Sequence, residues 1–167
     1  MHNTKNVLLT LATKHQQLMV YHLDGENIFG SDINIEKVKV AQVSSLDSPH
    51  KEAVIAKFPN ADTVNISCKV QLYGTEYAQN MIIISGQSFG QLELYEILSI
   101  VVCSGKVSFV TKKLPAWYFE HYRSFEVEES DYAEVSVLGA DELSHYYPLT
   151  AYSVGGKRWV TLRARLY

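Results

Sequence analysis

The sequence predicts an α+β protein, mainly β, in which two N-terminal helices pack on a small SH3-like antiparallel β-barrel. Three observations support this fold class. Apolar residues follow helical spacing in two early segments, and from Thr63 onward they alternate with polar residues in short runs. Turn residues separate these runs at roughly ten-residue intervals, as is typical of barrels and sandwiches. The 167 residues are expected to form a single domain, with a helical part over residues 1–60 and a β-barrel part over residues 61–167.

The N-terminal part contains the two expected helices. Residues 5–23 carry apolar side chains at positions i, i+3, i+4 and i+7, and Asp24-Gly25 ends this helix. The second helix begins at Ser48-Pro49, because proline is tolerated in a first helical turn. It ends before Pro59, because the residue ahead of a proline resists helical geometry. Residues 27–43 are expected to be irregular or to form an edge strand.

The β part begins with the alternating pattern at Thr63. The expected strands cover residues 63–72, 81–85, 94–102, 107–113, 123–128, 135–138, 151–154 and 159–166. Ser104-Gly105 and Gly155-Gly156 predict tight hairpins, and Gly74-Thr75 a further turn. Residues 86–90 are expected to form a loop, and residues 140–143 one helical turn.

Composition and charge bound the possible functions. The chain is 47% hydrophobic, which suffices for a packed core, and its net charge of −3 argues against a protein that coats nucleic acid. Residues 126–142 hold seven acids and no Lys or Arg, whereas residues 157–167 hold four bases and no acid. These two segments are expected to face each other or to solvate two surfaces.

Cysteine usage and hydropathy predict an intracellular location. Cys68 and Cys103 lie in strand-like apolar contexts, where each is expected to be a small buried side chain rather than half of a disulfide. No signal-peptide pattern is expected at the N-terminus, and the apolar runs are too short to span a bilayer. We therefore expect no membrane partner.

The most informative stretch is the aromatic connection between two strand patterns. Trp117, Tyr118, His121 and Tyr122 are the candidate binding residues, because Trp and Tyr bury a large area at a small entropic cost. Aromatic walls also recognise methylated ammonium groups. The alternative is structural: Trp117 and Phe119 close the open end of the barrel, while Tyr118 and Tyr122 extend from it.

No catalytic, metal or cofactor site is predicted. The sequence has no Gly-x-Ser-x-Gly elbow, and residues 86–90 lack the lysine of a phosphate-binding loop. The histidines lack metal-ligand spacing, and no Cys-x-x-Cys pair occurs. We therefore expect a protein that is not an enzyme and carries no cofactor.

A basic C-terminal strand supports a second hypothesis. Alternation places Trp159 and Thr161 on one face together with Arg163 and Arg165. The candidate nucleic-acid contacts are Lys157, Arg158, Arg163 and Arg165. Cations beside an aromatic on a barrel face are typical of single-strand binding.

Five segments in order carry a family resemblance: residues 11–23, 57–64, 73–86, 114–127 and 148–162, among them LPAWYFEHYRSFEV and PLTAYSVGGKRWVTL. On these segments the chain resembles the C-terminal domain of multi-copy, mobile-element-associated proteins of animal genomes, notably fish, some of which carry zinc fingers upstream. The resemblance implies an accessory interaction domain of a mobile-element-derived protein, with a nuclear location as one alternative. It implies no catalytic activity.

Together these observations predict a non-enzymatic protein-interaction module with an unidentified protein partner. The alternative is a nucleic-acid-binding β-barrel that uses the basic C-terminal strand. An unpaired barrel edge would also allow a homodimer.

Overall fold

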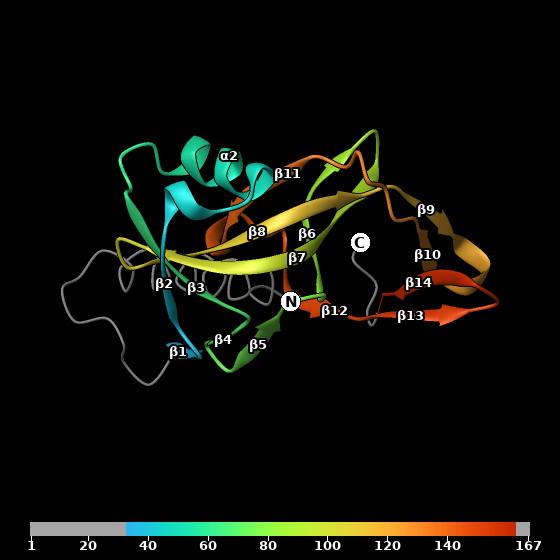
Figure 1. Ribbon diagram of the computed structural model, residues 1–167. Coiled ribbons are helices and arrows are strands. Elements are labelled where there is room, and N and C mark those ends of the chain that lie inside the picture. Colours follow the sequence, from blue (N-terminus) through green and yellow to red (C-terminus); the bar gives the residue numbers. More distant parts are fainter. Residues whose placement is uncertain (1–32, 163–167) are drawn as a thin grey trace.

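The computed structural model describes residues 33–162, and strands predominate in this part of the chain (Figure 1). The first elements are β1 (Ile33–Glu36), β2 (Lys39–Gln42), the 3₁₀ turn η1 (Val43–Ser45), helix α2 (Ser48–Lys57), β3 (Thr63–Ser67), β4 (Lys69–Leu72) and β5 (Thr75–Ala78). The central strands are β6 (Ile82–Ser88), β7 (Gln91–Cys103) and β8 (Lys106–Leu114). The last elements are β9 (Ala116–Phe119), η2 (Glu120–Tyr122), β10 (Ser124–Val127), β11 (Val135–Gly139), η3 (Ala140–Glu142), β12 (His145–Leu149), β13 (Ala151–Val154) and β14 (Lys157–Thr161).

The strands form three open antiparallel sheets, so the predicted SH3-like barrel with two helices is wrong. The sheet orders are β1-β4-β5, β13-β14-β10-β9 and β11-β8-β7-β3-β2, with β6 paired to both β7 and β12. A barrel closes only when its two edge strands pair with each other. In the largest sheet the edges β2 and β11 are instead separated by β3, β7 and β8.

Interruptions of the strands at two positions explain why they do not continue into a barrel. The expected strand over residues 63–72 is divided at Cys68 into β3 and β4, which belong to different sheets. The Ser67 hydroxyl donates to the carbonyl oxygens of Glu36 and Lys69 at this break. Pro115 makes the second break, because it ends β8 before β9 starts a separate sheet. Cys68 is consequently exposed, and the expectation that it is buried is wrong.

One of the two expected helices is confirmed. Helix α2 covers Ser48–Lys57 with proline in its first turn, and it places Ala53 and Val54 against apolar residues of β3, β7, β8 and β11. The other expected helix, at residues 5–23, lies outside the described residues. Strands β1 and β2 fall within the part expected to be helical or irregular, and β2 is indeed an edge strand.

Two-residue turns organise the hairpins. The predicted turns Ser104-Gly105 and Gly155-Gly156 connect β7 to β8 and β13 to β14, and both residues of each turn have positive φ. Residues 86–90, expected to be a loop, instead extend β6 as far as Ser88. The turn there consists of Phe89 and Gly90 alone, again with positive φ.

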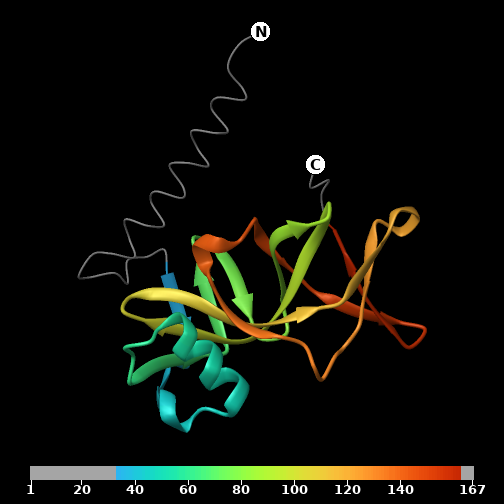
Figure 2. The same cartoon turned by 90° about the horizontal axis from the view of Figure 1, so that it is seen from above.

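The four-stranded sheet lies at the end of the molecule remote from α2 (Figures 1 and 2). Its inner face packs on β6, β7 and β8 through a buried apolar cluster, which comprises Ile82, Ile84, Leu94, Leu114, Phe125, Val127, Leu149 and Val160. This cluster gives the four-stranded sheet its core on the inner face. The side chains on the outer face of the sheet therefore do not have to form part of that core.

Candidate functional site

The aromatic stretch at residues 117–122 is a strand followed by a 3₁₀ turn rather than a loop. After Pro115, Ala116–Phe119 form edge strand β9, and η2 returns the chain to the antiparallel strand β10. Successive side chains of a strand point to opposite faces. Trp117 and Phe119 therefore share the outer face of the four-stranded sheet, and Ala116 and Tyr118 face its core.

Five aromatic side chains gather on this outer face or at its end, and we call them the aromatic face: Trp117, Phe119, Tyr122, Tyr152 and Trp159. Trp117 is 48% exposed and Phe119 is 40% exposed. The Trp159 ring lies edge-on to Phe119, with centroids 5.4 Å apart, and at 6.0 Å to Tyr122. Aromatic pairs of this geometry stabilise each other beyond their burial, so the rings of Phe119, Trp159 and Tyr122 form a connected cluster, and Trp117 and Tyr152 share its face of the sheet.

Tyr118 lies on the other side of the sheet. Its ring centroid is 5.0 Å from that of Phe125, and it packs against the buried cluster. The structural interpretation expects Trp117 and Phe119 to close the barrel end while Tyr118 and Tyr122 extend from it. It is wrong for Trp117, Phe119 and Tyr118, whereas Tyr122 does extend into solvent. Tyr118 serves the core rather than the aromatic face.

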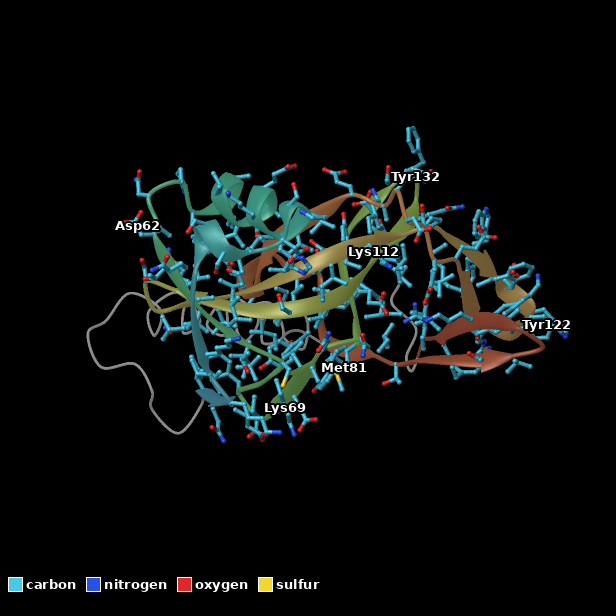
Figure 3. The ribbon with its side chains drawn as sticks, in the orientation of Figure 1. Asp62, Lys69, Met81, Lys112, Tyr122 and Tyr132 are labelled. Carbon is cyan, nitrogen blue, oxygen red and sulfur yellow. The ribbon has the colours of Figure 1, made fainter. Side chains whose placement is uncertain are left out.

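The turn η2 carries the remaining two candidate binding residues. Tyr122 is 63% exposed and points away from the end of the sheet (Figure 3). His121 is exposed and lies edge-on to Tyr122, with ring centroids 5.1 Å apart. Arg123 follows in the left-handed conformation, which lets the chain turn sharply from η2 into β10.

A chain of hydroxyl groups ties the strands of the face together. The hydroxyl of Tyr152 in β13 bonds Thr161 in β14 at 2.7 Å, and Thr161 bonds Ser124 in β10 at 2.8 Å. Ser124 in turn donates to the Tyr122 carbonyl oxygen at 2.9 Å. Hydrogen bonds to Thr161 and Ser124 lower the pKa of Tyr152. These hydrogen bonds connect β13, β14 and β10 on the outer face and tie η2 to them.

The candidate nucleic-acid residues that the structure describes point to opposite faces and are both ion-paired. Lys157 lies on the outer face, with its Nζ 2.7 Å from Glu126. Arg158 lies on the inner face, where it bonds the buried carboxylate of Glu96 and lies 3.3 Å from Glu129. The expectation that the acidic and basic segments face each other is confirmed for the pairs Lys157–Glu126 and Arg158–Glu129. Arg163 and Arg165 lie outside the described residues.

Sequence reasoning missed three contributors to this surface. Phe119, Tyr152 and Trp159 complete the aromatic face, although none was a candidate binding residue. Alternation along β14 places Trp159 on one face with Lys157 and Thr161, and alternation along β9 places Phe119 on the same face as Trp117, but only strand pairing brings these residues and Tyr152 together. The pairing of β10 with both neighbours could not be read from local spacing.

The described residues contain no cluster of three or more His, Cys, Asp or Glu side chains that could hold a metal ion. Over the same residues, no helix combines the length and apolar character needed to cross a membrane. In comparisons with known proteins, no family model, curated protein or solved structure matches this chain.

Proposed function

We propose that the protein is a non-enzymatic protein-interaction module and that its contact surface is the aromatic face of the four-stranded sheet. One observation carries this proposal. The sheet has a complete apolar cluster beneath it, yet it keeps large aromatic side chains on its exposed side. Contiguous apolar surface of this kind marks interaction sites, and Trp and Tyr are the residues that most often dominate binding energy.

The charge of this end of the molecule favours a basic protein segment as the partner. Residues 115–131 and 150–162 together carry five acidic and three basic side chains. Lys157 and Arg158 are both occupied by carboxylates of the same chain. A polyanion would therefore meet net negative charge, whereas a basic segment meets both the acids and the electron-rich faces of the rings.

The test is whether a folded variant of the aromatic face loses its binding to a defined partner. The wild-type protein would be immobilised, proteins captured from cell extract would be identified, and the strongest would be purified and titrated by calorimetry. We expect Trp117→Ala/Tyr122→Ala to weaken its binding at least about tenfold, because truncation of a hot-spot aromatic costs about 2 kcal/mol or more. Circular dichroism would verify that the variant is folded.

Tyr132→Ala is the matched control. Tyr132 is an exposed tyrosine like Tyr122, at 98% against 63%, but it projects away from the aromatic face (Figure 3). Equal partner binding by the wild type and by the Trp117→Ala/Tyr122→Ala variant would reject the face as the contact surface. Direct nucleic-acid binding that falls steeply between low and moderate salt would instead favour the alternative hypothesis.

A further inference from the structure

A row of four side chains crosses the aromatic face from one sheet edge to the other. Trp117 in β9 pairs with Glu126 in β10, and Glu126 pairs in turn with Trp159 in β14. Tyr152 in β13 completes the row opposite Trp159. Directly opposed residues of antiparallel strands point to the same face, with Cβ atoms about 4.5–5.5 Å apart. The carboxylate of Glu126 therefore lies between the two tryptophan side chains.

Glu126 is unusually buried for an acid on a solvent-facing side of a sheet. Its side chain is only 14% exposed, and its carboxylate binds the Lys157 ammonium at 2.7 Å. A half-buried carboxylate interacts with a cation more strongly than an exposed one, because water screens it less. Trp117 and Trp159 flank this carboxylate, so the aliphatic stem of a bound lysine can pack against their indole rings. This combination of groups is suited to holding an alkylammonium ion.

Lys157 already shows that a lysine ammonium fits at this carboxylate. Its own side chain is 59% exposed, and it stands at the start of β14, directly after the Gly155-Gly156 turn. Another lysine ammonium can replace that of Lys157 with little loss, because it makes the same ion pair with Glu126 while the exposed Lys157 ammonium returns to water. Lys157 therefore pairs with the Glu126 carboxylate but can be displaced from it by another cation.

We propose that the row formed by Trp117, Glu126 and Trp159 anchors a lysine side chain of the protein partner, whose ammonium displaces that of Lys157 from Glu126. This inference rests on the proposed function, and it adds the chemistry of the partner's anchor. It also makes Lys157 an internal competitor. Once displaced, the Lys157 ammonium lies at the edge of the aromatic face, where it can pair with another acidic side chain of residues 115–131.

Tryptophan fluorescence reports on this site alone. The chain contains two tryptophans, Trp117 and Trp159, and both belong to the row. The probe is a twelve-residue peptide of lysines spaced by glycine and serine, and its partner probe is the same peptide with every lysine acetylated. We expect the lysine peptide to change the emission saturably and the acetylated peptide to leave it unchanged.

Two variants with opposite expected effects test the competition. Glu126→Gln should weaken binding of the lysine peptide at least about tenfold, because a hydrogen bond to a charged group is lost. Lys157→Gln should strengthen it about two- to fivefold, because the internal competitor is removed. Glu120→Gln removes the same charge nearby and should weaken binding far less than Glu126→Gln does. Lys69→Gln breaks an ion pair away from the aromatic face (Figure 3) and should leave binding unchanged.

The inference fails if both peptides change the emission equally, or if Glu126→Gln binds the lysine peptide as the wild type does. It also fails if Glu120→Gln weakens binding as much as Glu126→Gln, since that would show unspecific attraction between opposite charges. None of these results rejects the proposed function. That function is decided by the purified partner and the Trp117→Ala/Tyr122→Ala variant, whose binding does not depend on the identity of the anchoring cation.

Discussion

The buried ion pair between Glu96 and Arg158 predicts a large loss of stability from one substitution. Glu96 is 6% exposed on β7, and Arg158 reaches it from β14. Removing one partner of such a pair typically costs about 3–5 kcal/mol, because a buried charge loses its compensation. Lys112 lies 3.8 Å from the second oxygen of Glu96 and retains part of that compensation. We therefore expect Arg158→Met to lower the free energy of unfolding by about 2–3 kcal/mol.

The assay is urea unfolding followed by circular dichroism at neutral pH. With a slope of about 2 kcal/mol per molar urea, the midpoint should fall by about 1–1.5 M. Lys157→Met is the control, since the Lys157 side chain is 59% exposed although Glu126 is only 14% exposed, and it should cost no more than about 1 kcal/mol. The double variant Glu96→Leu/Arg158→Met should recover most of the loss, because no uncompensated carboxylate remains.

Equal midpoints for Arg158→Met and Lys157→Met would refute this reasoning. They would show that Glu96 is well enough solvated to need no partner. The difference in stability cost between the Arg158 and Lys157 substitutions also affects any test of nucleic-acid binding. If Arg158 holds the four-stranded sheet to β7, binding lost in an Arg158 variant could reflect a displaced sheet, whereas Lys157 can be changed without that consequence.

Two further predictions concern strain and protonation. Phe89 is fully exposed at φ 51° in the turn between β6 and β7, so Phe89→Asn should raise the free energy of unfolding by about 0.5–1 kcal/mol; an unchanged or lower urea midpoint would show that the turn is not strained. Burial lowers the pKa of His145 below its usual value of 6.5, so the unfolded chain takes up the proton first. Thermal stability should then decrease as pH falls below about 6.5, and His145→Gln should flatten that decrease.

Local signals predicted the elements of this fold well. The Ser48-Pro49 start of α2 and its end before Pro59 follow from the restricted backbone of proline. Ser104-Gly105 and Gly155-Gly156 predicted two hairpins, because glycine readily adopts the positive φ that two-residue hairpin turns require. These features depend on a few neighbouring residues, and sequence alone contains that information.

The assignment of strands to sheets depends on distant contacts, and here prediction failed. The apolar alternation over residues 63–72 runs without interruption through Cys68, yet the chain changes sheets at that residue. Nothing within the segment signals the change. It results from β3 pairing with β2 and β7 while β4 pairs with β1 and β5. The barrel was inferred from strand number and spacing, which closed and open sheets share.

Aromatic density singled out residues 117–122, but it did not predict which of their side chains face outward. Ala116–Phe119 are all apolar, so no polar residue within β9 shows which side meets water. Strand β10 supplies the missing information, because Phe125 and Val127 are buried while Glu126 points outward. Once the two strands pair, Trp117 has to share the face of Glu126.

The same register that buries the core therefore builds the candidate site. A slip of one residue between β10 and β14 would turn Glu126 inward and Phe125 outward, which would bury an unpaired carboxylate and expose a core ring. The buried cluster under the sheet thus excludes the alternative registers. Because of this coupling, the tryptophan–carboxylate row can form only in a correctly packed sheet. Substitutions on the outer face should alter binding while the core keeps the strands in place.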